Sequence, residues 1–325
     1  MLKISFSKNK IKAILSLILL FMMLSSCSTR LVTIPEYKSF TDDAGREVTL
    51  YSKPQRVAVL MSSLAEVWAL SGGKIDITVG ETVERGIADG SVILVDDGAG
   101  KTINTELLIN GKPDFVICSA DISAQYEAAL LLEETGTPSA CFRIESFEDY
   151  LRVLSLFCDI TENKTAYEKY GLEVEMRVSA VRSNPLIGDR ERTALFLRAG
   201  SSASSVKAKQ SSDHFAAQML TELGLLNIAD DAPILVDSLS AEEILLRDPE
   251  YIFISTMGDE EAAKKNVREM FSGPEWKSLS AVKNEKYVFL PKELFHYKPN
   301  ARWGEAYRFL MEVIYDYVDF EYEQA

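Results

Sequence analysis

The chain has 325 residues, of which 47% are hydrophobic and 26% charged, so it is long enough to form two cores of ordinary domain size. Its formal net charge is −14, and residues 1–26 contain four Lys and no acidic residue, which leaves 31 basic against 49 acidic residues in the remainder. This composition argues against nucleic acid as a partner, because a phosphate backbone requires a basic stripe and the sequence contains none.

The N-terminal segment predicts export and lipidation. The four Lys precede an apolar run of about twelve residues, Ala13 to Leu24, whereas a bilayer requires ~20 to be crossed. The run ends in LSSC, which resembles the lipobox of bacterial lipoproteins. We therefore expect residues 1–26 to be a signal peptide, Cys27 to carry a lipid anchor at the extracytoplasmic face of the cell membrane, and residues 27–40 to form a polar tether. The alternative is an ordinary secretory signal with an incidental Cys.

The remaining cysteines do not predict a disulfide framework. Lipidation of Cys27 would leave Cys118, Cys141 and Cys158, and three cysteines cannot all pair with one another. All three lie in apolar runs, so we expect buried free thiols.

The rest of the chain alternates predicted strands with predicted helices in two series. One series occupies residues 41–158 and the other residues 185–325. The strands are continuously apolar, which is typical of parallel sheets covered by helices on both faces. We therefore predict an α/β fold with two Rossmann-like lobes, each built on a parallel sheet.

The segment between the two series, residues 159–184, predicts one long α-helix that bridges the lobes. Its apolar residues recur at intervals of three and four and would form one stripe: Tyr167, Tyr170, Val174, Val178 and Val181. Gly171 would cost this helix about 1 kcal/mol. The helix must end before Pro185.

One unit occurs in both series. TELLINGKPDFVI, residues 105–117, is matched by AEEILLRDPEYIFI, residues 241–254, and Glu106 and Glu242 each stand seven residues before a Pro. Asn104 and Ser240 can cap a short helix that places each Glu in its first turn, and Glu243 can complete a capping box. A carboxylate there can simply complement the helix dipole, worth ~0.3–1 kcal/mol. Two copies at equal spacing favour a shared function.

These features together resemble a known family. The segment from Phe40 to Gly73, the unit around Glu106, the connecting helix and the ending KPNARWGEAYRFL are similar to substrate-binding lipoproteins of ABC importers for iron complexes and cobalamin. The resemblance covers nearly all of the chain from about Phe40. It implies two lobes that close only slightly on their ligand. It also implies that Glu106 and Glu242 contact Arg residues on the two halves of a two-fold symmetric permease.

Ligand is expected in the cleft between the lobes, because open parallel sheets bind ligands beyond the carboxyl ends of their strands. The candidate ligand-binding residues in those loops are Ser62, Ser63, Arg143, Arg198, Met257, His296, Tyr297 and Arg302. The three Arg could pair with an anionic chelate, and His296 or Tyr297 could be an axial ligand of haem iron. Each of these residues also has a plain structural explanation, such as a surface charge or a strand end.

The expected cargo is an iron complex, either a siderophore or haem, and the alternative is a corrinoid such as cobalamin. We expect no intrinsic cofactor and no site for a free metal ion, because two His are too few. An exported enzyme on this scaffold would need a nucleophile with its base, or clustered metal ligands, and the sequence shows neither. A sensing lipoprotein without a permease is a third possibility, which the two matched Glu disfavour.

Overall fold

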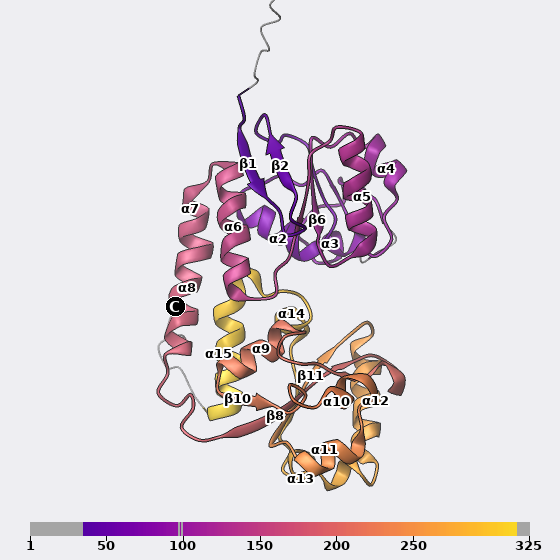
Figure 1. Ribbon diagram of the computed structural model, residues 1–325, viewed down its shortest axis with the longest axis vertical. Helices are drawn as coiled ribbons and strands as arrows, with labels where there is room; N and C mark the ends of the chain where they lie inside the picture. The colour runs from indigo at the N-terminus through magenta and orange to yellow at the C-terminus, as the bar shows by residue number, and fades with distance from the viewer. Residues whose placement is uncertain (1–34, 97, 99, 317–325) are drawn as a thin grey trace, which may run out of the picture.

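The computed structural model describes residues 35–316 except 97 and 99, and Figure 1 shows two lobes joined along one side by helices. The predicted signal peptide and Cys27 lie outside the described residues. Within the described part of the chain, no helix combines the length and apolar character needed to cross a membrane.

The N-terminal lobe contains a five-stranded parallel sheet with the order β5-β4-β3-β6-β7. The central strands are buried throughout, as expected when helices cover both faces of a parallel sheet. An antiparallel hairpin precedes the sheet. The strands are β1 (Lys38–Thr41), β2 (Glu47–Leu50), β3 (Val57–Val59), β4 (Ile77–Thr78), β5 (Ile93–Leu94), β6 (Phe115–Ser119) and β7 (Ser139–Phe142). The helices are α2 (Ser62–Leu70), α3 (Gly80–Glu84), α4 (Thr105–Asn110), α5 (Ser123–Glu134) and α6 (Phe147–Thr161).

The C-terminal lobe repeats this plan with the parallel order β10-β8-β11-β12. A short fifth strand, β9, pairs antiparallel with the end of β8. The sequence predicted a purely parallel sheet, and the prediction is wrong for this strand. The strands are β8 (Arg192–Ala199), β9 (Lys207–Ala208), β10 (Leu225–Asn227), β11 (Tyr251–Thr256) and β12 (Tyr287–Phe289). The helices are α9 (Phe215–Glu222), α10 (Pro233–Ser238), α11 (Ala241–Arg247), α12 (Glu260–Ser272), α13 (Ser280–Lys283), α14 (Lys292–Phe295) and α15 (Trp303–Tyr315).

The two lobes are bridged by a continuous helical segment, as the sequence predicts, but it begins at Lys164 rather than at residue 159, because α6 continues to Thr161 and ends at Glu162 in a left-handed conformation. It consists of α7 (Lys164–Tyr167), a π-helical turn (Glu168–Leu172) and α8 (Glu173–Arg182). The π turn contains Gly171, where an added Cβ would lie 2.9 Å from the ring of Tyr167. The glycine is therefore explained by close packing of this ring. Val174 and Val178 are buried, and α8 packs against α15.

The largest hydrophobic core is shared by both lobes. It extends from the inner face of the N-terminal sheet, past α8, to the inner face of the C-terminal sheet. Trp303 lies near its centre, with ring centroids 5.9 Å from Phe147 and 5.6 Å from Phe215. Because separating the lobes would expose this core, the packing opposes a wide hinge motion.

The repeated unit occupies equivalent places in the two lobes. Helix α4 precedes β6, which lies between β3 and β7, and helix α11 precedes β11, which lies between β8 and β12. The predicted caps are confirmed: Asn104 Oδ1 accepts a hydrogen bond from Leu107 N at 3.0 Å, and Ser240 Oγ accepts one from Glu243 N at 3.4 Å.

The three described cysteines are free and buried, as expected. Cys118 on β6 and Cys141 on β7 are register partners, yet they are not bonded to each other. The fold therefore depends on packing rather than on a covalent cross-link.

Candidate functional site

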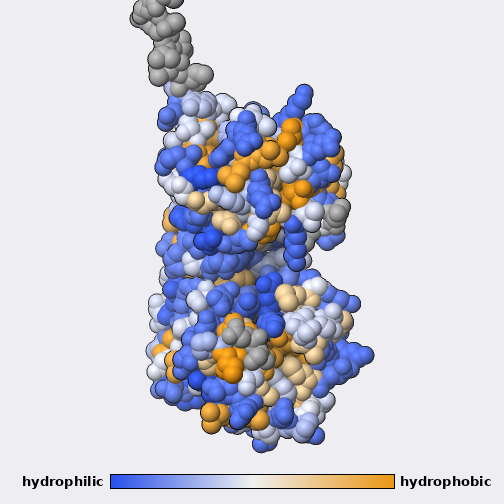
Figure 2. Space-filling view, turned by 45° about the vertical axis from the view of Figure 1, so that its right-hand side comes forward, coloured by the Kyte–Doolittle hydropathy of each residue, from blue (hydrophilic) through white to orange (hydrophobic). Residues whose placement is uncertain are grey.

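The surface is hollowed between the two lobes, as Figure 2 shows. Both lobes line a cavity of ≈ 430 Å³ in this region, and most of its lining is charged. The lining residues are Glu66, Glu84, Arg85 and Ile87 from the N-terminal lobe and Lys292, Glu293, Tyr297, Pro299 and Arg302 from the C-terminal lobe.

Arg85, which follows α3, organises the N-terminal wall of this cavity. Its guanidinium donates to Glu66 Oε2 at 2.7 Å and to Ser62 Oγ at 3.1 Å, and the Ser62 hydroxyl in turn donates to Glu81 Oε2 at 2.5 Å. Ser62 is therefore buried beneath Arg85 with its hydroxyl fully engaged. The network holds the Arg85 side chain in one place, facing the other lobe.

Two contacts join this wall to the C-terminal lobe. The Arg85 guanidinium stacks 4.2 Å from the centroid of the Tyr297 ring, a cation–π contact. Asn300 Nδ2 donates to Ser63 O and to Glu66 Oε2, both at 3.0 Å. Asn300 is completely buried and has a φ of 53°, a left-handed conformation that Asn tolerates better than most residues. The lobes are thus connected by polar contacts as well as by the shared core.

Cationic and imidazole groups collect at the inner face of the C-terminal sheet. Burial, with nearby Arg198, lowers the pKa of His296 to about 4, and burial with nearby Lys298 holds the pKa of His214 well below its usual 6.5. Burial also lowers the pKa of Lys298, whose Nζ pairs with Glu145 Oε1 of the N-terminal lobe at 2.8 Å. Both imidazoles are therefore neutral at pH 7.

The structure brings six of the eight predicted ligand residues to the region between the lobes. Ser62 and Ser63 are buried under the N-terminal wall, and Tyr297 and Arg302 line the cavity. Arg198 and His296 lie near each other at the inner face of the C-terminal lobe. Their contact with a ligand stays a prediction.

The other two predicted residues lie at strand ends away from this cavity's lining. Arg143 follows β7, is exposed, and its Nε pairs with Asp121 Oδ1 at 2.6 Å. Met257 follows β11, where its backbone N–H donates to Ala199 O at 2.8 Å. Arg302, although it lines the cavity, already forms two hydrogen bonds to Glu305, both at 2.7 Å.

Several residues of the site are not evident from the sequence. Glu66, Arg85, Lys298 and Asn300 carry the contacts between the lobes, but none was among the predicted ligand residues. Arg85 directly follows the short helix α3, and no local sequence pattern marks it as a residue that faces the other lobe. Lys298 and Asn300 fall within the KPN of the C-terminal motif, which was the only sequence signal for them.

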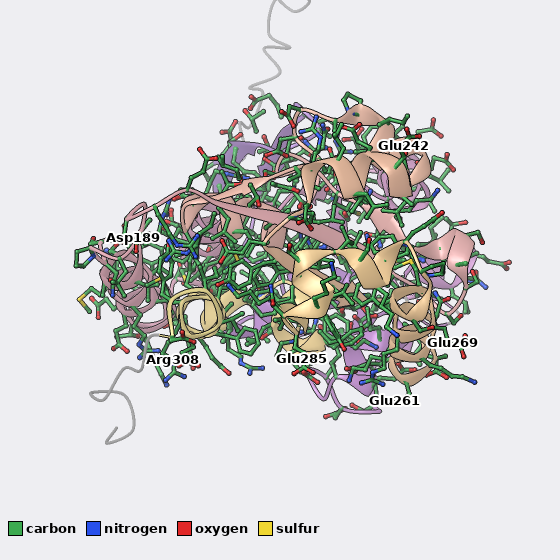
Figure 3. All side chains as sticks on the ribbon, turned by 90° about the horizontal axis from the view of Figure 1, so that it is seen from below. Asp189, Glu242, Glu261, Glu269, Glu285 and Arg308 are labelled. Atoms are coloured by element: carbon green, nitrogen blue, oxygen red, sulfur yellow. The ribbon has the colours of Figure 1, made fainter. Side chains whose placement is uncertain are left out.

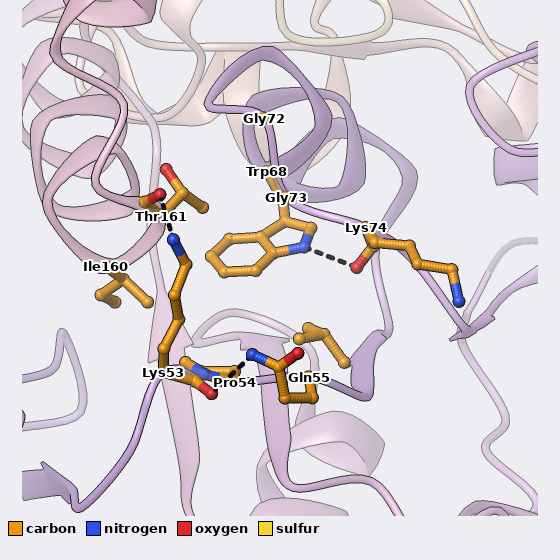
Figure 4. A pocket seen from close by; sticks show the side chains of 10 residues that line it. Lys53, Pro54, Gln55, Trp68, Gly72, Gly73, Lys74, Ile160 and Thr161 are labelled. Carbon is orange, nitrogen blue, oxygen red and sulfur yellow. Dashed lines mark hydrogen bonds between the residues drawn. The ribbon is translucent and has the colours of Figure 1, made fainter.

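A second cavity, of ≈ 220 Å³, lies within the N-terminal lobe and is shown in Figure 4. It is bounded by Trp68, whose indole N–H donates to Lys74 O at 2.9 Å. Gly73 allows this packing, since an added Cβ would lie 2.1 Å from the indole. This cavity contains no residue of the C-terminal lobe, so it is separate from the interlobe site.

No group of three or more His, Cys, Asp or Glu side chains that could hold a metal ion occurs among residues 35–316 with positions 97 and 99 set aside. The iron of haem would arrive with the ligand, so its ligation by His296 or Tyr297 is a separate question and stays a prediction.

Glu106 and Glu242 are both exposed on their short helices. In the described structure neither carboxylate forms a hydrogen bond or an ion pair. Each is followed three residues later by an exposed aliphatic side chain, Ile109 at 37% and Leu245 at 36% exposure. Figure 3 shows Glu242 on a different side of the lobe from Glu261 and Glu269.

In a comparison with protein families, the model described as "Periplasmic binding protein" matches residues 57–294. A comparison with curated proteins finds no significant match. Among solved structures, an ABC transporter substrate-binding protein from Listeria monocytogenes has a TM-score of 0.67 at 18% identity, over 82% of this chain and 100% of that chain.

Two further structures are similar to a comparable extent. Staphylococcus aureus IsdE complexed with heme has a TM-score of 0.67 at 16% identity, over 80% of this chain and 98% of that chain. S. aureus SirA complexed with staphyloferrin B has a TM-score of 0.62 at 18% identity, over 86% of this chain and 97% of that chain. Their two-lobed fold is the fold of this chain.

We predict that His214 makes stability fall on acidification. Its pKa is lower in the folded state than the ordinary 6.5, so below about pH 6.5 the unfolded chain binds more protons and the free energy of unfolding decreases. His214→Asn keeps an acceptor for Ala216 N at the start of α9 but does not titrate. Urea unfolding at pH 7 and pH 5 should show a smaller loss for the variant, by up to about 1.4 kcal/mol per pH unit. Equal losses in both proteins would contradict this assignment.

Proposed function

The chain belongs to the periplasmic binding protein family, and from this premise we propose that it is an extracytoplasmic solute-binding lipoprotein of an ABC importer. It captures an iron complex, either a siderophore or haem, in the cleft between the lobes and delivers it to the permease. The family consists of binding proteins, so the exported enzyme considered from the sequence is set aside.

The chemistry of the cleft supports an iron complex as cargo. Tyr297 offers an aromatic face, and Lys292, which forms no ion pair within the described residues, offers positive charge beside it, whereas Arg85 and Arg302 are already paired with Glu66 and Glu305. Such a lining suits a flat or anionic chelate. Structures with the same fold include proteins named with heme, with staphyloferrin B, and with ferric iron bound by two molecules of acinetobactin. A corrinoid remains the alternative cargo.

The observation that carries the delivery step is the pair of matched glutamates. Glu106 on α4 and Glu242 on α11 are exposed and carry no partner within the residues that the structure describes. In Figure 1 both helices lie away from the bridging helix α8, one on each lobe. Each ion pair at an exposed rim contributes only ~0.2–1 kcal/mol, so apolar neighbours such as Ile109 and Leu245 would add to the contact.

Reversing both charges should separate import from binding. We expect Glu106→Lys combined with Glu242→Lys to abolish uptake of an iron complex by cells, because two attractive contacts with the permease become repulsive. Affinity for the complex, measured on the soluble fragment by quenching of Trp68, Trp276 and Trp303, should be unchanged.

The matched control reverses two exposed charges on α12. Glu261→Lys combined with Glu269→Lys makes the same change in net charge on a different side of the lobe (Figure 3), so uptake should persist. Normal uptake by the first double variant, or an equal loss of uptake in the control, would contradict the docking role.

The lipid anchor rests on the LSSC sequence and the apolar run before it. Two acyl chains on Cys27 would be sufficient for stable attachment to a membrane. We expect the wild-type protein to remain with the membrane fraction and to incorporate a labelled fatty acid. Cys27→Ala should lose the label and be released, whereas a protein that stays membrane-bound without Cys27 would exclude this anchor.

A further inference from the structure

Arg198, at the carboxyl end of β8, lacks the partner that a half-buried guanidinium normally has. Its Nε is inaccessible to solvent and has no acceptor, and no carboxylate of the described chain forms an ion pair with it. The one carboxylate that acts on the Arg198 charge is that of Glu145, and its Oε1 is already paired with Lys298 Nζ at 2.8 Å. Leaving a cation in this state is unfavourable, because burial removes hydration without a compensating hydrogen bond.

A second cation lies on the neighbouring strand. Lys207 on β9 is the register partner of Arg198 on β8, so the two side chains emerge on the same face of the sheet. Lys207 is exposed and likewise has no acidic partner among the residues described. Like charges directly opposite each other on neighbouring strands are destabilising unless an anion lies between them.

The same face of the sheet carries further positive potential. Lys209 follows two residues after Lys207, and its N–H donates to Phe196 O at 3.0 Å. The Phe196 ring stacks on His214 at 4.7 Å, and Lys209, Lys298 and Arg198 all depress the pKa of that imidazole. A bound anion here would therefore meet several positive groups, and Glu145, the carboxylate that acts on Arg198, is already paired with Lys298.

The other arginines near the cleft do not share this state. Arg85 is paired with Glu66, Arg143 with Asp121 and Arg302 with Glu305. An anionic ligand would have to compete with those carboxylates. At Arg198 it would meet no competitor.

We propose that Arg198 and Lys207 form an anion subsite of the cleft, and that the cargo is an iron chelate with at least one free carboxylate, which lies between these two cations. The inference rests on the proposed function and specifies its cargo. Haem meets the requirement through its propionates, and so does a hydroxycarboxylate siderophore. Cobalamin, whose ring side chains are amides, and neutral trihydroxamate chelates do not.

The test compares ligands with and without free carboxylates, and the first pair differs in the carboxylates alone. Haem and haem dimethyl ester form one pair, and ferric citrate and the neutral chelate ferrichrome form another, with cyanocobalamin added. Affinities are measured with the soluble fragment that begins after Cys27, using tryptophan quenching and, for haem, the Soret band.

We expect at least one carboxylate ligand to bind roughly tenfold or more tightly than its capped or neutral counterpart. Arg198→Gln and Lys207→Gln should each weaken that ligand by about tenfold and leave the counterpart unchanged. Lys283→Gln is the matched control, because it removes one exposed charge from α13, at the far end of the C-terminal lobe in Figure 1. This variant should bind like the wild type.

Stability provides a second readout. Removing an unpaired, half-buried cation from the empty protein should leave the free energy of unfolding of Arg198→Gln unchanged or higher. If this variant instead unfolds more easily and loses all ligands equally, Arg198 is a structural residue and the subsite is wrong.

The remaining outcomes separate the inference from the function on which it rests. Tight binding of ferrichrome, cyanocobalamin or haem dimethyl ester that neither substitution affects would overturn the anion subsite but leave the binding function intact. Failure of every ligand in the panel to bind the wild-type fragment would overturn the proposed function, and the anion subsite with it.

Discussion

The contact of Asn300 with the N-terminal lobe is the interaction on which the rest of the structure depends. Its amide donates to Ser63 O and Glu66 Oε2 from a completely buried position, in a left-handed conformation. Three residues later Trp303 packs between Phe147 and Phe215 at the centre of the shared core. Because one short segment fixes both polar and apolar contacts, the lobes are held at one separation, and the cleft exists before any ligand enters.

The fixed separation of the lobes determines which charged groups can make contact across the cleft. Arg85 reaches Tyr297 and Lys298 reaches Glu145 only because the lobes stand at this distance. The same constraint sets the positions of α4 and α11, and therefore of the two exposed glutamates. One rigid framework can thus hold a ligand and present a matched pair of carboxylates to a symmetric partner.

The net charge of the protein is negative, whereas one face of its C-terminal lobe is positively charged. The chain carries a net charge of −14, yet the inner face of its C-terminal lobe gathers Arg198, Lys207, Lys209 and Lys298. An acidic exterior favours contact with a basic partner surface, whereas a local cationic site is needed to retain an anionic ligand. The separation of the two explains how one acidic protein can meet both requirements.

Features encoded by short segments were predictable from the sequence. The caps at Asn104 and Ser240, the apolar stripe around Val174 and the alternation of strands and helices all depend on neighbouring residues, and the structure confirms them. The capping box predicted for Glu243 does not follow this rule, because Arg247, one turn later, takes that carboxylate at 2.5 Å.

Features that depend on distant residues were not predictable. The pairing of β9 with β8 and the roles of Arg85 and Asn300 are decided by contacts across the fold. The sequence proposed Arg143, Arg198 and Arg302 as partners for an anion, with Arg143 favoured over the other two. Only the structure shows that two of them already have a carboxylate.

The distance between the lobes tests the account most directly. Spin labels on Asn110→Cys in α4 and Leu246→Cys in α11 report this distance in the soluble fragment, where the described cysteines are buried. Diamagnetic Ga(III) replaces iron in the citrate and porphyrin ligands. We predict one narrow distance distribution that shifts by less than ~2 Å on saturation with a ligand. A broad distribution in the empty protein, or a shift of more than about 5 Å on binding, would contradict a cleft held at a fixed width.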